Sequence, residues 1–332
     1  MSSCATAALL MLMMVTSMMK PGVPPGLPLP GGAGKRLEIT FEPGSTNLLA
    51  IPQQTWSDVL SHAKCSIMSI MDSKTARAFV LSGSSLIVRS NQVILKTCGP
   101  TSLLSALEPV MEMAGKQANL SNIMFTRGLV ASSNRQPSPH RSFADEVRFL
   151  DRKYDGQSIA IDNGFHMWTM SPTPCSTVFE VVMRDLPQDV MKASAYEFKF
   201  SPSRGGDRWV EYLVPGARVN GQWFQPRGYI CNAFAGNDDH MFTIHIAQQT
   251  SCSYVTFESN FIDKGMLERV VQFFRPGTLT IVTIPGTETM ANDFAAGGYA
   301  GRHASMVDVL DRYTRTSTAY HPHLGFQSFQ RL

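Results

Sequence analysis

Cysteine is rare in the sequence. Only six cysteines occur among 332 residues, and no two of them form a Cys-x-x-Cys pair. A disulfide scaffold would be denser in cysteine, so we expect free thiols, a reducing compartment and a cytoplasmic protein. No metal is expected either, because the close histidine pair His321 and His323 has a proline between its members and no third ligand near it.

Charge and long apolar runs are also scarce. Charged residues make up 17% of the chain, the net charge is +3, and no basic run is interleaved with aromatic residues, which argues against nucleic acid as a partner. The apolar run at residues 7–19 falls short of the roughly 20 residues that span a membrane. No basic residue precedes this run, so a cleaved secretory signal is the less favoured alternative.

Apolar residues are plentiful, at 43% of the chain, which is enough for a substantial core. Residues 21–34 are rich in proline and glycine and predict an extended or disordered linker. We therefore expect residues 1–35 to form a tail and residues 36–332 to form a single domain.

Alternating apolar residues predict strands along most of that domain, with a few amphipathic helices between them. The helices are expected at residues 56–63 with Thr55 as the N-cap, from residue 101 with Pro109 as a kink or an end, at residues 143–154 with Ser142 as the N-cap, and at residues 263–274. The two halves look alike but show no clear residue-level repeat. This pattern predicts an α+β fold in which two mainly antiparallel sheets face each other and the helices lie outside.

The stretch at residues 79–98 is the most informative. Two apolar half-strands flank a polar break at Gly83 and Ser84, and the strand at residues 93–97 leads directly into Cys98. On pattern alone, this is an edge strand with a Gly-Ser bulge followed by a buried cysteine.

These residues resemble a known family. The segments LSGSSL at residues 81–86 and ILKTCG at residues 94–99 are similar to the processing site and the acid-cysteine strand of eukaryotic S-adenosylmethionine decarboxylase proenzymes. Further similar segments follow in the same order: PHR at residues 139–141, FQPRGY at 224–229, TIHI at 243–246, SYVTFE at 253–258 and FRPG at 274–277. The shared order of these segments makes the resemblance specific. The resemblance implies the four-layer α/β/β/α sandwich of that family.

The resemblance implies a chemistry. Self-cleavage between Gly83 and Ser84 would convert Ser84 into a pyruvoyl group, which forms a Schiff base with S-adenosylmethionine and acts as an electron sink. Cys98 would be the acid that reprotonates the substrate carbon, and His245 would assist self-cleavage. Phe41 and Phe224 would stack on the adenine. Glu42 matches the first of two catalytic carboxylates.

The chain departs from the family at several positions. Gly83 replaces a glutamate, and the second catalytic carboxylate falls on Thr46, or on Ser45 if the one-residue insertion at Pro43 is placed otherwise. Ile230 stands where the family has a processing serine, and Gln249 stands where a carboxylate holds the ribose. Glu180 and Glu258 match acids of the putrescine site, but a third acid falls on Ser176, which argues against putrescine activation.

Two functions are compatible with these residues. One is a pyruvoyl-dependent decarboxylase that supplies the aminopropyl donor for spermidine and spermine. The alternative is an inactive paralogue that binds and activates an active decarboxylase. The partners would be S-adenosylmethionine in the first case and a homodimer or heterodimer partner in the second, with no membrane involved.

Overall fold

The computed structural model describes residues 34–128, 136–161, 165–171, 177–190, 207–224, 228–238, 240–249, 252–261, 264–284, 313–321 and 324–332. Residues 1–33 of the predicted tail lie outside these ranges, and Lys35 already belongs to the first strand. No helix in the described part of the chain is long and apolar enough to cross a membrane.

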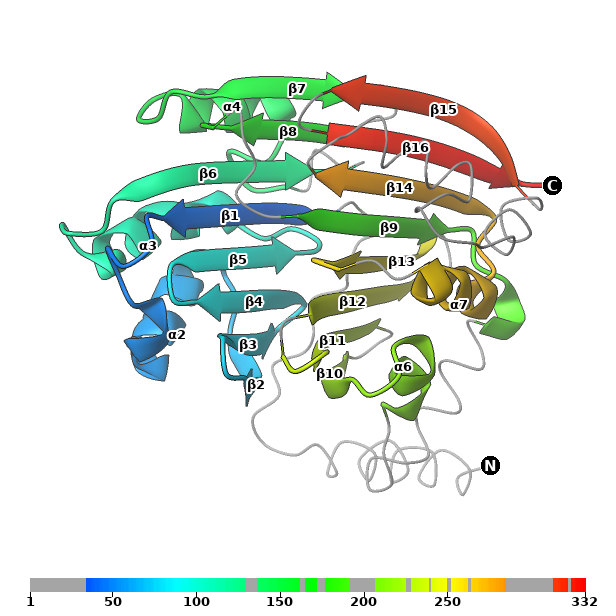
Figure 1. The fold of residues 1–332 in the computed structure, drawn as a ribbon. Helices are drawn as coiled ribbons and strands as arrows, with labels where there is room; N and C mark the ends of the chain where they lie inside the picture. The colour runs from blue at the N-terminus through cyan, green and yellow to red at the C-terminus, as the bar shows by residue number, and fades with distance from the viewer. Residues whose placement is uncertain are drawn as a thin grey trace, which may run out of the picture.

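The strands form two sheets of eight, with antiparallel neighbours throughout the described pairs (Figure 1). Sheet A contains, in order of pairing, β2 (Ile67–Asp72), β3 (Ala76–Leu81), β4 (Ser84–Arg89), β5 (Gln92–Thr97), β1 (Lys35–Phe41), β6 (Leu120–Arg127), β8 (Phe165–Thr169) and β7 (Gln157–Ile161). Sheet B contains β10 (Arg218–Phe224), β11 (Gly228–Ala235), β12 (His240–Gln249), β13 (Cys252–Ser259), β9 (Val178–Arg184), β14 (Thr278–Ile284), β16 (Leu324–Arg331) and β15 (Tyr313–His321).

The two sheets share one topology. Each strand of sheet A has a counterpart eight strands later at the same place in sheet B, so the order 2-3-4-5-1-6-8-7 becomes 10-11-12-13-9-14-16-15. The likeness of the two halves is therefore a duplication of topology, although the residues show no clear repeat.

Alternation along each strand divides its side chains between two faces. On β1, Leu37, Ile39 and Phe41 join a core shared with helices, whereas Arg36 and Glu38 point to the opposite face. Sheet A is covered by α2 (Gln53–His62), η2 (Leu103–Ala106), α3 (Leu107–Ala114) and α4 (Phe143–Leu150), while α6 (Arg208–Leu213) and α7 (Lys264–Phe274) cover sheet B (Figure 1). A short η1 (Leu48–Ala50) lies between β1 and α2. The predicted four-layer sandwich is confirmed.

The inner faces of the two sheets meet in the middle of the molecule. One inter-sheet cluster joins Ala78, Ile87 and Ile94 of sheet A to Phe234 and Met241 of sheet B. A second inter-sheet cluster lies around Met124, Met167, Val178 and Val282. Buried polar groups fill the space between these clusters, so the candidate site is enclosed by both sheets.

Helix ends follow the predictions only in part. Ser142 caps α4 as predicted, since its Oγ accepts a hydrogen bond from the Asp145 amide. Thr55 is not the cap of α2, because that helix already begins at Gln53 after Pro52. Pro109 neither kinks nor ends α3. It sits in the first turn, where an amide has no helical acceptor to lose.

Candidate active site

The predicted cleavage point lies in a tight hairpin turn. Leu81 at the end of β3 pairs with Ser84 at the start of β4, so Ser82 and Gly83 alone connect the two strands. Gly83 has φ of +84°, a left-handed conformation that a residue without a Cβ adopts at no steric cost. The Gly83–Ser84 bond is therefore held at one end of sheet A.

Ser84 points away from the other sheet. Its side chain is fully buried, and its Oγ accepts a hydrogen bond from Cys65 Sγ, 3.7 Å away. Alternation puts Ser84 on the face of Leu86, which packs toward the helices. The structure thus does not bring the Ser84 hydroxyl to His245 in the uncleaved chain.

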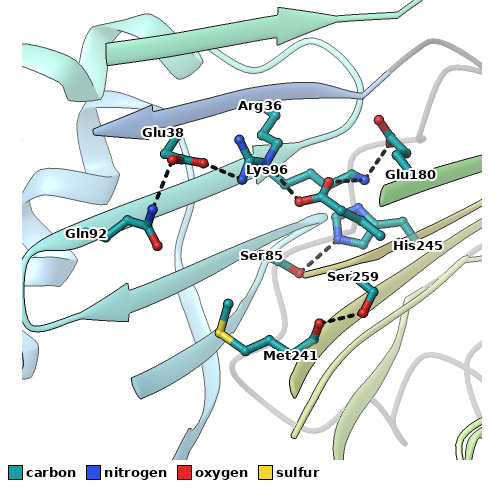
Figure 2. Close-up of polar contacts among 10 residues, drawn as sticks. Arg36, Glu38, Ser85, Gln92, Lys96, Glu180, Met241, His245 and Ser259 are labelled. Carbon is teal, nitrogen blue, oxygen red and sulfur yellow. Dashed lines mark hydrogen bonds and ion pairs between the residues drawn. The ribbon is translucent and has the colours of Figure 1, made fainter. Parts of the chain in front are cut away.

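Ser85, one residue further, faces sheet B instead. Ser85 Oγ lies 2.9 Å from Nε2 of His245, and Nδ1 of the same ring lies 3.2 Å from Cys98 Sγ. Figure 2 shows Ser85 on β4 reaching across to His245 on β12. Two of the predicted catalytic residues, Cys98 and His245, are therefore together, and the third partner is a residue that our sequence reasoning missed. Its position directly after Ser84 on an alternating strand was the available signal.

Burial keeps this pair uncharged. Loss of hydration, together with the nearby Lys96 ammonium, lowers the pKa of His245 to about 3, although Glu258 opposes the shift. Burial raises the pKa of the Cys98 thiol, and a hydrogen bond from Tyr254 and the Lys96 charge offset only part of this effect. At neutral pH the two side chains are therefore a neutral imidazole and a thiol.

Ile230 lies directly beside this pair. It is paired with His245 across β11 and β12, which places both side chains on the inner face of sheet B. Ile230 is buried, so an aliphatic side chain stands next to the imidazole where the resemblance expects a hydroxyl. Phe224 ends β10 opposite Gly228, on the same face of sheet B as Ile230. Gln249 is the last residue of β12.

Next to the pair, a buried ionic network joins the two sheets. Lys96 Nζ lies 2.7 Å from both Glu180 and Glu258, which face each other on neighbouring strands. Arg36 binds Glu258 through Nε at 2.9 Å and Glu38 through Nη2 at 2.6 Å. Figure 2 shows how these chains converge from β1, β5 and β9. The predicted acids Glu180 and Glu258 are thus together, and each is already paired with a cation of sheet A.

The structure overturns the placement of Phe41 and Glu42. Phe41 is fully buried in the core between sheet A and its helices, on the opposite face from Arg36 and Glu38. Glu42 is exposed just beyond the end of β1, whose register runs from Lys35 opposite Thr97 to Thr40 opposite Gln92. Glu42 and its neighbour Thr46 therefore lie at the far end of the sheet from Cys98, and neither Phe41 nor Glu42 reaches the site.

A second buried amine supports the loop that carries Cys98. Lys35 Nζ donates to the carbonyls of Gly99 and Thr101 at 3.1 and 2.9 Å and to Gln136 Oε1 at 2.8 Å. Burial lowers the pKa of Lys35 to about 8, although Glu146 opposes the shift. Sequence reasoning missed this residue, because a lysine at the start of a strand is normally a solvated one.

Within the described residues, no group of three or more His, Cys, Asp and Glu side chains is placed to hold a metal ion. The functional groups that the structure brings together are thus a thiol, an imidazole, hydroxyls and an ionic network. They can hold and move a proton at one end of the inter-sheet space.

Comparisons with known proteins agree with this arrangement. Residues 31–321 match the family model for adenosylmethionine decarboxylase. The chain is 32% identical over 273 residues to the S-adenosylmethionine decarboxylase proenzyme of Dictyostelium discoideum, covering 76% of this chain and 70% of that protein. It is 29% identical over 317 residues to the proenzyme of Caenorhabditis elegans, covering 87% and 83%.

A solved structure shares the fold. The crystal structure of the Trypanosoma brucei AdoMetDC-delta26 monomer is similar with a TM-score of 0.56, over 74% of this chain and 99% of that one. Sequence identity in this alignment is 18%, so the likeness supports the sandwich architecture alone.

Proposed function

The chain belongs to the adenosylmethionine decarboxylase family, and from this membership we propose that it decarboxylates S-adenosylmethionine with a pyruvoyl group made from Ser84. The product would be the aminopropyl donor for spermidine and spermine. The observation that carries the proposal is the contact of Cys98 with His245, which in turn binds the residue that follows Ser84. A cytoplasmic location is part of the proposal, since a thiol acid needs a reducing compartment.

The residues around Ser84 fit a pyruvoyl group at that position. Ser84 is buried, so water has little access to it, and Gly83 gives the preceding carbonyl conformational freedom. Once the chain is cut, residue 84 would be a chain terminus joined covalently only to Ser85, at the end of β4 where it pairs with Thr97 of β5. The group would supply an electron sink that lets CO₂ leave.

The protein's own groups would then handle the protons. Cys98 stays protonated because burial raises its pKa, so its thiol can donate to the substrate carbon. His245 stays neutral, so one of its ring nitrogens carries no proton and would take one up during self-cleavage. Phe224 and Gln249 are the remaining candidates for adenine stacking and for a hydrogen bond to the ribose. Phe41 and Glu42 have no part in this proposal.

Putrescine is not proposed as an activator. Lys96 Nζ occupies the point between Glu180 and Glu258 where an added ammonium would bind, and Arg36 holds the other oxygen of Glu258. A diamine would have to displace a buried, doubly paired lysine.

Ile230 supports a second candidate function. An isoleucine beside His245 leaves self-cleavage without the hydroxyl of the family, and the Ser84 hydroxyl faces Cys65 instead of the imidazole. Under this alternative the chain is an inactive paralogue that pairs with and activates a functional decarboxylase.

A gel of the purified full-length chain separates the two candidates. The decarboxylase predicts fragments of 83 and 249 residues, the larger with a blocked N-terminus. Ser84→Ala should abolish the cut and is the matched control. A single uncut band with a free N-terminus after long incubation would favour the paralogue, and stimulation of an active family member by the uncut chain would then test that role directly.

A further inference from the structure

Ser85 has no role in the function proposed above, yet it makes the only hydrogen bond from β4 to the imidazole among the described residues. We infer that Ser85 is a positioning residue: its Oγ accepts a hydrogen bond from Nε2–H of His245, which leaves Nδ1 without a proton, so that Nδ1 accepts a hydrogen bond from the Cys98 thiol. The distances of 2.9 Å to Oγ and 3.2 Å to Sγ carry the inference.

The direction of each hydrogen bond follows from what each group can donate. A neutral imidazole has one N–H and one lone-pair nitrogen, so it cannot donate to both neighbours or accept from both. Thiol sulfur is a weak acceptor, so the ring N–H is not placed on the nitrogen that faces Cys98, and the S–H of Cys98 donates to that nitrogen. Nδ1 is then the acceptor, and Nε2–H must find an oxygen. Ser85 Oγ is that oxygen.

The opposite arrangement, a thiolate beside an imidazolium, is disfavoured by the surroundings. His245 faces Ile230 on β11, Thr256 on β13 and the Lys96 ammonium of β5, and the only carboxylate acting on it, Glu258, is already held by Lys96 and Arg36. A cation on the ring would therefore be poorly compensated. This separates the pair from a nucleophilic cysteine, because the sulfur here retains its proton.

The hydrogen bond between Ser85 and His245 also affects where the imidazole lies relative to the cleavage point. Ser85 is covalently attached to Ser84, so the same hydrogen bond that selects the tautomer also fixes the ring relative to the residue beside the cleavage point. This consequence rests on the proposed decarboxylase function, whereas the tautomer itself does not.

The test measures the tautomer in the full-length protein by NMR with ¹⁵N-labelled histidine. The signals of His245 among the eight histidines are identified by their loss in His245→Gln. The wild-type ring should carry its proton on Nε2 between pH 6 and pH 8. Ser85→Ala should shift the Nε2 signal and mix the two tautomers, while Ser85→Thr, which keeps the hydroxyl, should restore the wild-type pattern.

Thr256→Val is the matched control. Thr256 is paired directly with His245, and its buried Oγ1 has no hydrogen-bond partner among the described residues, so this variant removes a neighbouring hydroxyl without touching the ring's partners. It should leave the tautomer unchanged. A wild-type ring protonated on Nδ1, or a Ser85→Ala spectrum identical to wild type, would overturn the inference, and the first outcome needs no variant to fold. Absence of self-cleavage in every variant would count against the proposed function while leaving the tautomer result intact.

Discussion

Cys98 and His245 share a hydrogen bond, but the proposed function uses them in different steps. We expect Cys98→Ala to leave self-cleavage largely intact and to abolish most decarboxylation, because a methyl group cannot return a proton to the substrate. His245→Ala should instead stall cleavage at the ester that Ser84 forms. A time course of fragment formation, with CO₂ release measured on the cut protein, distinguishes the two variants.

Hydroxylamine supplies the control for that pair of variants. It cleaves esters, so it should restore the cut in His245→Ala and have no effect on Ser84→Ala. If Cys98→Ala blocked the cut and His245→Ala did not, the two roles would be reversed.

The sequence indicated which residues lie close together better than it indicated which face of a strand each side chain takes. The order of motifs along the chain correctly brought Cys98 and His245 together, although they are 147 residues apart in sequence. Phe41 was misplaced because a buried aromatic residue fits a core as well as an adenine site, and only the neighbours of β1 decide which face it takes. Ser85 was missed because its partner, His245, lies on the other sheet, and the sequence of β4 does not show which strand of sheet B it faces.

Helix caps allow a test at the level of single elements. Ser142→Ala should lower the free energy of unfolding by about 1 kcal/mol, because the Asp145 amide at the start of α4 loses its acceptor. Thr55→Ala, at the cap suggested by sequence alone, should change it little, because Thr55 lies inside α2, where alanine is the better helix former. Urea unfolding of both variants at pH 7 provides the comparison, and equal losses would contradict the observed helix boundary.

Most strands could be predicted as elements, but their partners could not. Residues 229–234, 241–248 and 253–258 alternate clearly and became β11, β12 and β13. Alternation does not say that β1 lies between β5 and β6, or that β9 repeats this place between β13 and β14. Strand neighbours depend on long-range packing, so the duplicated topology became visible only in three dimensions.

Buried ion pairs connect the two sheets of the molecule. Arg36 and Lys96 belong to sheet A, while Glu180 and Glu258 belong to sheet B, and all four are buried. Both carboxylate partners of Lys96 lie in sheet B, so neither sheet could bury these groups alone without leaving charges unpaired.

Lys96 is the cation of this network that pairs with both Glu180 and Glu258. We expect Lys96→Met to lower the free energy of unfolding at pH 7 by roughly 3–5 kcal/mol, since it leaves two carboxylates facing each other in a dry interior. Adding Glu180→Gln should recover part of the loss, because the repulsion then disappears. Urea unfolding of the wild type, both single variants and the double variant gives the coupling energy. Additive losses would show that Lys96 does not hold the two sheets through Glu180.

The loss of folding stability at low pH provides an independent measurement of the same ionic network. Burial alone would raise the pKa of Glu258, but Lys96 and Arg36 lower it from 4.5 to about 2. As the pH falls from 4.5 toward 2, the unfolded chain therefore binds a proton that the folded chain does not, and the protein loses stability across that window. Without Lys96, the folded pKa of Glu258 should rise, so this contribution to the loss should shrink and be complete at a higher pH, while its start near pH 4.5 is unchanged. Unfolding of Glu180→Gln with and without Lys96→Met across this range tests the shift, because Glu180, the other partner of Lys96, is then neutral in both proteins and the acidic groups away from the network cancel in the difference. Parallel curves would mean that the pKa of Glu258 does not depend on Lys96.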